Sequence, residues 1–453
     1  MIDSTVTSGE KSKADDTKVS DHVHRARVLV LAYGAANVRS AYSHRILAMA
    51  RTLAEFGHPV ALLWFTAFYR VSPNDQFTEL RKLMSVFVCP TLPIPISGSV
   101  TPNRMKFASR LHAGLQVVSD ALGYRRCVNV TRRIALRHQA EIIHAETALC
   151  GSVALDTGVG ARVVTDLHGD IGAELRMSEA PAWLIRRRVQ EEIKVIRHAD
   201  CMTTASHVQR LDILARSGRP NLPIHVVPCG VDVDRFAAGS NLREATRTRL
   251  GVSARHVVCY SGGLHLWQCI DETLDLVEAM RKRNRDIFFL FLTAGDSSRW
   301  AKALARIGRQ GVDWLALQLS PAQVPEHLAA ADIGVLLRRD HPVNAAASPT
   351  KLGEYLAAGL PVITTRFAGD APGILDTSGC GIVLGDVLPT PPELIALDAF
   401  VMRHAGDRDT QGRLCRQLAM RSQSWEIASR ELKALYERPP LVPHESDPVR
   451  PLT

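Results

Sequence analysis

The chain has 453 residues, 46% of them hydrophobic and 22% charged, and its formal net charge at pH 7 is +9. This length suits two domains, and this composition excludes a chain that is disordered over most of its length. No apolar run reaches the roughly 18 residues needed to cross a bilayer, so the sequence also excludes a membrane-spanning helix.

The first 24 residues form a largely polar stretch that lacks the apolar core of a signal peptide, which predicts a disordered tail on a cytoplasmic protein. The nine cysteines are scattered and include no Cys-x-x-Cys pair. We expect buried free thiols rather than a disulfide framework or a zinc site. The aromatic and Cys/His signatures of nucleic-acid-binding modules are missing from the sequence, so nucleic acid is not expected as a partner.

Short β-branched runs alternate with helical stretches along the chain, which predicts an α/β protein with parallel sheets. A helix is expected over residues 40–56, and a Pro/Gly segment at 228–236 predicts an interdomain joint. The strands expected before the joint are 27–32, 60–65, 141–145, 162–165, 201–204 and 224–227. The strands expected after it are 256–260, 287–292, 312–317, 333–337, 361–365 and 381–384.

Most of the excess positive charge lies between Arg104 and Arg137, where eight basic residues accompany a single acid, Asp120. Apolar residues at 107, 111, 115, 118 and 122 have helical spacing and predict an amphipathic helix. Such a stripe more often packs against its own domain. The basic surface would nevertheless suit an anionic lipid head group or a phosphate-bearing acceptor.

The first turn of each predicted half is the place where dinucleotide and P-loop proteins hold phosphate. Here these turns are Tyr33–Arg39 and Ser261–Gln268, and neither contains G-x-G-x-x-G or G-x-x-x-x-G-K-[ST]. NAD-linked redox chemistry and P-loop hydrolysis are therefore disfavoured. Gly262 and Gly263 would still let the backbone approach a diphosphate closely, although such a pair is equally typical of a tight turn.

The most informative stretch predicts a short helix, with Ser348 as its N-cap, Pro349 as its first residue and Gly359 just past its end. The N-terminus of such a helix offers unbonded N–H groups, to which Lys351 adds a full charge. Glu354 lies three residues further on the same face. This arrangement could hold a diphosphate at the helix start and ribose hydroxyls at the carboxylate. The alternative is a Lys–Glu pair on the surface of a capped helix.

Taken in order, these motifs resemble the retaining GT-B glycosyltransferases of family four. The resemblance extends over residues 27–436 and is carried by segments 53–60, 166–169, 199–206, 230–236, 260–264, 331–335 and 351–362. It implies two Rossmann-like domains facing across a cleft, with a nucleotide-sugar donor bound mainly by the C-terminal one. It also implies a glycan or lipid-linked acceptor on the N-terminal domain, and no cofactor, because the nucleotide sugar is a substrate.

The implied division of the chain has six parts. They are a disordered tail (1–24), an acceptor domain (25–227), the joint (228–236), a donor domain (237–423), a helix crossing back to the first domain (424–437) and a flexible tail (438–453).

The resemblance places His168 near the reacting anomeric carbon as the candidate catalytic residue, with a core histidine as the alternative. It places Glu354 on the ribose, and Lys351 and the glycine pair beside the diphosphate. The full set of expected donor-binding residues is Gly262, Gly263, Arg338, Thr350, Lys351 and Glu354, and the acceptor-side candidates are Gly34, Asn37 and Arg39.

Three positions depart from the family pattern. Ala346 replaces the first of two glutamates, while Gly263 and Gln268 replace the arginine and lysine that commonly clamp the diphosphate. The phosphate charge would then rest on Lys351, on Arg338 or Arg339, and on helix N–H groups.

The D-x-D formed by Asp232 and Asp234 lies in the joint, so no metal site is expected. We therefore expect a metal-independent transferase in cell-surface polysaccharide or glycolipid biosynthesis, cytoplasmic or peripheral on the inner face of the membrane. A catalytically weak or inactive protein that binds nucleotide sugar or a partner is the second hypothesis. A nucleotide-sugar epimerase is a minor third.

Overall fold

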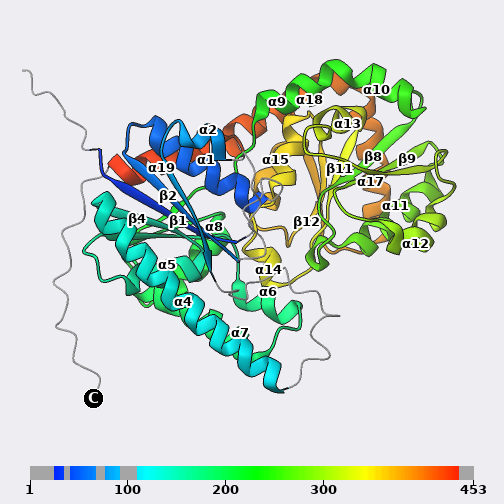
Figure 1. Ribbon diagram of the computed structural model, residues 1–453. Coiled ribbons are helices and arrows are strands. Elements are labelled where there is room, and N and C mark those ends of the chain that lie inside the picture. The colour runs from blue at the N-terminus through cyan, green and yellow to red at the C-terminus, as the bar shows by residue number, and fades with distance from the viewer. Residues whose placement is uncertain (1–24, 35–40, 68–76, 92–109, 438–453) are drawn as a thin grey trace, which may run out of the picture.

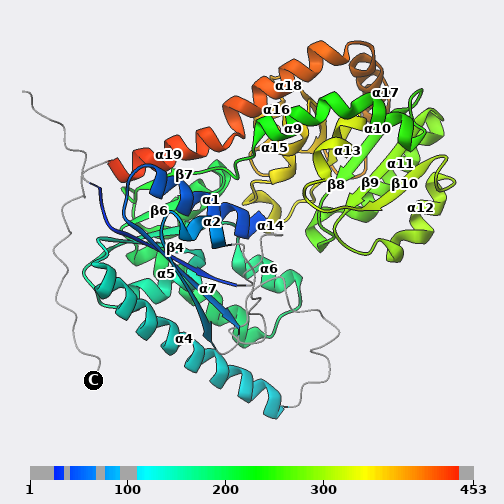
Figure 2. The same ribbon diagram turned by 45° about the horizontal axis from the view of Figure 1, so that its top comes forward.

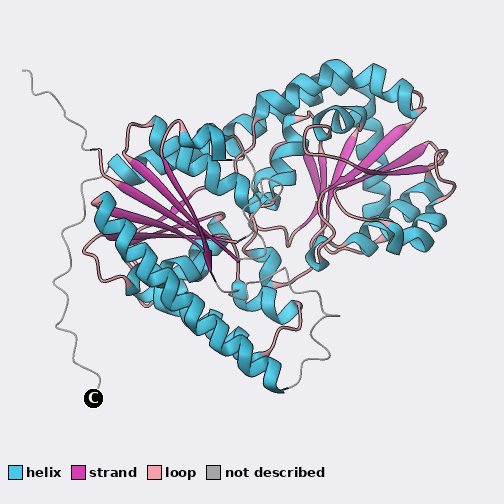
Figure 3. Cartoon of the chain, viewed as in Figure 1, coloured by secondary structure: helices cyan, strands magenta, loops and turns pink. Residues whose placement is uncertain are grey.

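The computed structural model describes residues 25–34, 41–67, 77–91 and 110–437. Both predicted tails lie outside this part of the chain. Two parallel sheets, each covered by helices, form two lobes (Figures 1 and 3). Every predicted strand is present, with ends within two residues of the expected ones.

The N-terminal sheet has the strand order β3-β2-β1-β4-β5-β6-β7. Its centre is β1, whose six side chains are all buried because helices cover both faces of the sheet. β1 pairs on one side with β2 and on the other with β4, with Val28 between Val60 and Ile142. The strands are β1 (Val28–Tyr33), β2 (Val60–Ala67), β3 (Ser85–Thr91), β4 (Ile142–Glu146), β5 (Arg162–Leu167), β6 (Cys201–Thr204) and β7 (Ile224–Val226).

The helices of this domain follow the apolar periodicity of the sequence. α1 (Ala41–Glu55) is the helix expected over 40–56, and it turns Ile46, Met49 and Leu53 into the core. The others are α2 (Thr78–Arg81), α4 (Arg110–His138), α5 (Thr147–Asp156), α6 (Ile171–Met177), α7 (Ala182–His198) and α8 (His207–Ser217).

The long helix α4 lies on the outside of the N-terminal domain (Figure 1). Within the predicted apolar stripe, the side chains of Val118 and Leu122 are exposed, so this part of the stripe does not pack against its own domain. The other three stripe positions fall where the structure describes no side chains. α4 buries Cys127, Thr131 and Ala135 instead.

The C-terminal sheet has the order β10-β9-β8-β11-β12-β13, so each sheet reverses its strand order beside the first strand. Such a reversal opens a crevice at the carboxyl ends of the strands. The strands are β8 (His256–Ser261), β9 (Ile287–Thr293), β10 (Trp314–Gln318), β11 (Ile333–Leu336), β12 (Val362–Thr365) and β13 (Gly381–Leu384). The helices are α9 (Val233–Ala238), α10 (Arg243–Leu250), α11 (Ile270–Arg283), α12 (Ala301–Ile307), α13 (Val324–Ala330), α14 (Pro342–Ala345), α15 (Thr350–Ala357), α16 (Ala371–Leu375), α17 (Pro391–Gly406), α18 (Arg408–Ser422) and α19 (Trp425–Glu437).

The last two helices connect the lobes. α18 packs on α15, and α19 continues onto the N-terminal domain beside α1 (Figure 2). There Leu432, Leu435 and Tyr436 join the core formed by α1 and the sheet. Trp425 Nε1 also donates a hydrogen bond of 2.9 Å to Oγ1 of Thr52.

The chain thus passes between the domains twice, through the joint and again before α19. The two passages meet at a bridge between Val231 and Ser424. Gly230 permits this contact, since a Cβ there would lie 2.6 Å from Cε3 of Trp425. None of the helices in the described part of the chain is both long and apolar enough to span a membrane.

Candidate active site between the two domains

A cavity of about 720 Å³ lies between the domains. The joint and α1 form one side of it, and the ends of β8 and β9 and the start of α15 form the other. Four of the predicted donor-binding residues line this cavity: Gly262, Gly263, Thr350 and Glu354. The cavity is also lined by Arg45 of α1, which the sequence analysis did not single out.

The glycine pair follows β8 in a turn that only glycine accommodates. Gly262 has a φ of +148°, and a Cβ at this position would lie 2.9 Å from Nζ of Lys351. The Tyr260 hydroxyl donates a hydrogen bond of 2.6 Å to the carbonyl of Gly263. The backbone of this turn therefore lies against the buried Lys351, with no side chain between them.

The start of α15 differs from the sequence prediction. Pro349 occupies the N-cap position, and no side chain caps the helix. Ser348 is not the N-cap, because its hydroxyl instead accepts a hydrogen bond of 3.3 Å from the N–H of Cys229 in the joint. The helix ends as expected, with Gly359 at a φ of +77°. The first turn of α15 is thus left without a side-chain cap and can bind an anion.

Lys351 is buried, with 6% of its surface exposed, so the alternative of a surface Lys–Glu pair is wrong. Its Nζ donates a hydrogen bond of 2.7 Å to Oε1 of Gln268 and lies 4.1 Å from the ring centre of Tyr260. Burial lowers the pKa of Lys351 well below its usual range, and the nearby guanidinium of Arg338 lowers it further, against the opposing effect of Glu354.

Arg338, whose guanidinium lies near Lys351, is also buried. One of its nitrogens donates to the carbonyl of Leu337, while Nε has no partner among the described residues. Burial lowers the pKa of Arg338, and no carboxylate is among the groups that raise it. The neighbouring Arg339 is paired with Glu272 instead. Two buried basic residues, Lys351 and Arg338, therefore lie near one another, and the carboxylate that acts on Lys351 is Glu354, whose pKa is raised by burial.

His168, the candidate catalytic residue, lies at the end of β5 in the N-terminal domain. Its Nε2 is 2.6 Å from Oδ2 of Asp166 and 3.0 Å from Oε2 of Glu146. Burial lowers the pKa of His168, but these two carboxylates raise it by more, to about 10. The ring is not among the residues that line the cavity; Arg45, which lines it, binds Asp166 through two nitrogens at 2.8 and 3.0 Å.

The sequence analysis missed Glu146 and Arg45. The signal for Glu146 was an acid at the carboxyl end of a buried strand, since all five residues of β4 are buried. Of the acceptor-side candidates, Gly34 directly follows β1, and its carbonyl accepts a hydrogen bond of 3.2 Å from Trp64 Nε1. Asn37 and Arg39 lie outside the described residues.

The same cluster includes one group that could bind a metal ion. Ligand atoms of His144, Glu146 and Asp166 lie within 4.8 Å of one another. Arg45 already occupies both oxygens of Asp166, however, and His168 contacts both carboxylates. The two acids thus have two cationic partners. The D-x-D serves another purpose, because Asp232 caps α9 by accepting the N–H of Arg235.

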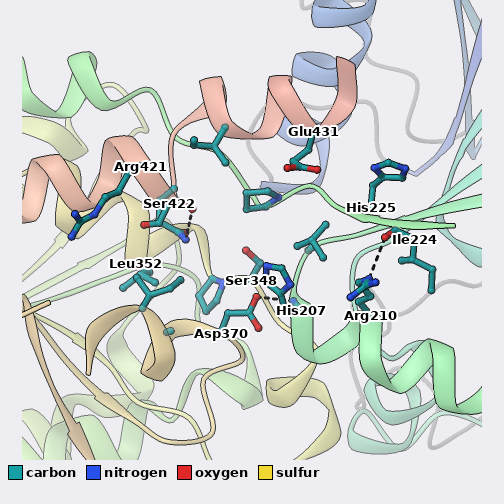
Figure 4. Close-up of a pocket in the computed structure, with 18 of the residues that line it drawn as sticks. His207, Arg210, Ile224, His225, Ser348, Leu352, Asp370, Arg421, Ser422 and Glu431 are labelled. Atoms are coloured by element: carbon teal, nitrogen blue, oxygen red, sulfur yellow. Dashed lines mark hydrogen bonds between the residues drawn. The ribbon is translucent and has the colours of Figure 1, made fainter. Parts of the chain in front are cut away.

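A second cavity of about 620 Å³ lies on the other face of α15, where the two domains touch (Figure 4). There the carboxylate of Asp370 accepts hydrogen bonds of 2.7 and 3.2 Å from the N–H groups of His207 and Val208, at the start of α8. Ser206 caps α8 and donates to the carbonyl of Ala346 at 3.0 Å. These contacts fasten the C-terminal domain to the N-terminus of a helix in the other domain.

We expect Asp370→Ala to favour a more open arrangement of the domains. Loss of a carboxylate bonded to a helix N-terminus should cost about 1.5–3 kcal/mol, or roughly a 10- to 100-fold shift between closed and open forms. Small-angle X-ray scattering would show a larger radius of gyration. Asp376→Ala, which removes an exposed acid from the end of α16, is the control and should leave the scattering unchanged.

Two family models match the chain. Residues 40–230 match the glycosyl transferase 4-like domain, and residues 255–392 match the glycosyl transferases group 1. The chain belongs to this glycosyltransferase family. These matches confirm the glycosyltransferase family to which the sequence motifs pointed.

Two bacterial glycosyltransferases are similar to this one in sequence. TuaH of Bacillus subtilis (strain 168), whose assignment to teichuronic acid biosynthesis is provisional, is 28% identical over 261 residues. This match covers 54% of the present chain and 59% of TuaH. A GDP-mannose-dependent alpha-(1-6)-phosphatidylinositol monomannoside mannosyltransferase of Mycolicibacterium smegmatis is 25% identical over 287 residues, or 59% of this chain and 72% of its own.

Solved structures confirm the GT-B fold of this glycosyltransferase. Anabaena HepE in complex with UDP superposes with a TM-score of 0.63 and 16% identity, covering 90% of this chain and 99% of HepE. Sucrose-phosphate synthase from Thermosynechococcus elongatus has a TM-score of 0.61 and 17% identity over 90% of this chain and 98% of its own.

Proposed function

We propose that the protein transfers a sugar, with retention, from a nucleotide-diphosphate sugar to a glycan or lipid-linked acceptor in polysaccharide or glycolipid biosynthesis. The observation that carries this proposal is the excess of buried cations beside the uncapped start of α15. Glu354 is the carboxylate that acts on Lys351, and no carboxylate acts on Arg338, so a bound diphosphate would supply the negative charge that these buried groups lack.

The printed names of related proteins support this choice of donor. HepE has been solved with UDP and with UDP-glucose, and the mycobacterial relative depends on GDP-mannose. The name of TuaH places it in teichuronic acid biosynthesis, and the name of the mycobacterial enzyme includes a phosphatidylinositol monomannoside; these names support a glycan or glycolipid acceptor.

The position of Lys351 favours an active enzyme over the alternative of a weak or inactive protein. Its Nζ contacts Gln268, the position at which a clamping lysine was expected from the family resemblance. Lys351 of α15 thus brings a basic group to the position where the sequence has Gln268 instead of the expected lysine. The carbonyl of Ala346, where the first glutamate is missing, contributes to the contact between the domains.

Incubating the protein with UDP-, GDP- and ADP-sugars tests the proposal. At least one donor should be hydrolysed or transferred, with release of the nucleoside diphosphate, and ¹H NMR of the product would show a retained anomeric configuration. We propose that the diphosphate is neutralised by cations and helix N–H groups, so EDTA should leave the rate unchanged. Failure to bind any nucleotide sugar would contradict the proposed donor. Activity that EDTA abolishes and Mn²⁺ restores would contradict the proposal that cations and helix N–H groups neutralise the diphosphate.

We further propose that helix α4 holds the N-terminal domain against an anionic membrane surface. Its outer face carries exposed Val118 and Leu122, followed by exposed arginines. Asp120, the single acid of this region, is turned inward and paired with Arg188, so it does not offset the charge at the surface. The exposed arginines are Arg125, Arg126, Arg132, Arg133 and Arg137.

We expect replacement of Arg125, Arg126, Arg132 and Arg133 by glutamine to reduce co-sedimentation with vesicles that contain anionic lipid. Each arginine near such a surface contributes about 1 kcal/mol, and the attraction should weaken as the Debye length falls from about 10 Å at 0.1 M salt to about 3 Å at 1 M. The matched control makes the same change at four exposed basic residues of the C-terminal domain: Lys302, Arg309, Arg403 and Arg413. Equal binding of both variants at both salt concentrations would exclude this role for α4.

A further inference from the structure

Four charged groups are enclosed together at the carboxyl ends of β4 and β5. Asp166 and Glu146 are fully buried, and Arg45 is 4% exposed. Two carboxylates can be buried at low cost only when two cations accompany them. Arg45 supplies one cation, and the imidazole of His168 is the remaining group in contact with both acids.

Asp166 and Glu146 differ in the number of hydrogen bonds that their carboxylates accept. Asp166 accepts two bonds from Arg45 and one of 2.7 Å from the hydroxyl of Thr203, in addition to His168. Glu146 accepts from His168 through Oε2, while its Oε1 has no hydrogen-bond partner among the described residues. Within the described part of the chain, the buried carboxylate of Glu146 therefore depends on His168 alone for a donor.

This geometry decides where the ring carries its protons. Nε2 faces two carboxylate oxygens, so an unprotonated Nε2 would place its lone pair against both. Nε2 is thus a donor, and charge balance requires the second proton on Nδ1. No described residue accepts a hydrogen bond from Nδ1, and the side chain keeps 19% of its surface exposed.

We propose that Glu146 is a positioning residue that, with Asp166 and Arg45, holds His168 as an imidazolium whose Nδ1–H is presented to the substrate. This inference rests on the proposed function, because it assigns His168 the part of a fixed hydrogen-bond donor and cation in the transfer. The same arrangement excludes His168 as a general base, since both of its nitrogens already carry protons.

The other titratable groups around the ring agree with this state. Tyr42 of α1 lies with its ring centre 5.3 Å away, and burial raises its pKa, so the phenol is neutral. His144 faces Glu146 at 3.8 Å, and burial lowers its pKa, so it adds no third cation. Nδ1 of His144 is bonded at 2.7 Å to the hydroxyl of Tyr436 on α19. Arg45 also donates to the carbonyl of Pro228, so the cluster contacts the joint as well as the last helix, α19.

The test is the titration of His168 in Glu146→Gln, measured by NMR on protein with ¹³C-labelled histidine. His168→Asn identifies the signal. In the native protein this ring should titrate near pH 10. Loss of the Glu146 charge should lower its proton affinity at least tenfold, while Glu55→Gln, at an exposed position of α1, should not change it.

Activity gives the second readout. A protonated His168 is required, so Glu146→Gln should move the alkaline fall in kcat to lower pH. Glu146→Asp should restore part of the native profile. An unchanged titration of His168 would overturn the inference even in an active enzyme. The titration needs no substrate, so it can succeed or fail independently of whether the protein transfers sugar.

Discussion

Lys351→Met should reduce the affinity for the nucleoside diphosphate about 10- to 100-fold, the value of a lost charge-assisted contact of roughly 1.5–3 kcal/mol. The same change should leave the melting temperature equal or higher, because a buried amine that lies near the cation Arg338 and bonds to Gln268 is replaced by an apolar chain of similar length. Loss of function with no loss of stability is what distinguishes a ligand-binding lysine from a structural one.

Isothermal titration calorimetry with UDP and GDP measures this effect, and Lys302→Met, at an exposed lysine of the same domain, is the control. The buffer dependence of the heat gives a further check. Burial and Arg338 depress the pKa of Lys351, and an anionic ligand would raise it again, so binding should take up a proton and weaken as pH rises. Native affinity in Lys351→Met, or binding without proton uptake, would remove Lys351 from the diphosphate site.

His168→Asn should lower kcat about 100- to 1000-fold, the usual effect of removing one fixed donor from a transition state. Donor affinity should change little, because the donor-binding residues lie in the other domain. The variant should also be less stable, since two buried carboxylates keep Arg45 as their sole cation. Steady-state kinetics and thermal unfolding measure the two effects separately.

The double variant His168→Asn, Glu146→Gln separates catalysis from stability. It restores charge balance, so its stability should recover relative to His168→Asn, while kcat should remain low. His198→Asn, at an exposed position at the end of α7, is the control. Recovery of kcat in the double variant would show that His168 acts through the stability of the cluster and not on the substrate.

The sequence was sufficient to predict the strands, because their apolar runs are continuous where both faces of a sheet are covered. The strand that escaped prediction is β3, an edge strand that contains Pro90 and is only half-buried along most of its length. Proline lacks the N–H for a ladder bond and weakens the pattern, although an edge strand tolerates it. Parallel pairing with β2, from Ala61 opposite Ser85 to Ala67 opposite Thr91, holds this strand in the sheet.

The donor side of the site was partly predictable from local patterns, and the N-terminal side was not. The placement of Lys351 and Glu354 followed from helix geometry, even though Ser348 proved to be bonded to the joint instead of capping the helix. The partners of His168 could not be found in this way. Arg45 and Asp166 are 121 residues apart in the chain, and no local pattern indicates which base meets which acid across a sheet.

The paired passages between the domains set limits on how the molecule can move. The joint and the start of α19 are bridged at Val231 and Ser424, so both covalent connections lie on one short line. A rigid rotation of one lobe leaves atoms on that line almost still and displaces others in proportion to their distance from it. Trp425, packed against Gly230, lies near this axis. A bulky residue at position 230 would therefore displace the axis itself and alter every distance across the cleft.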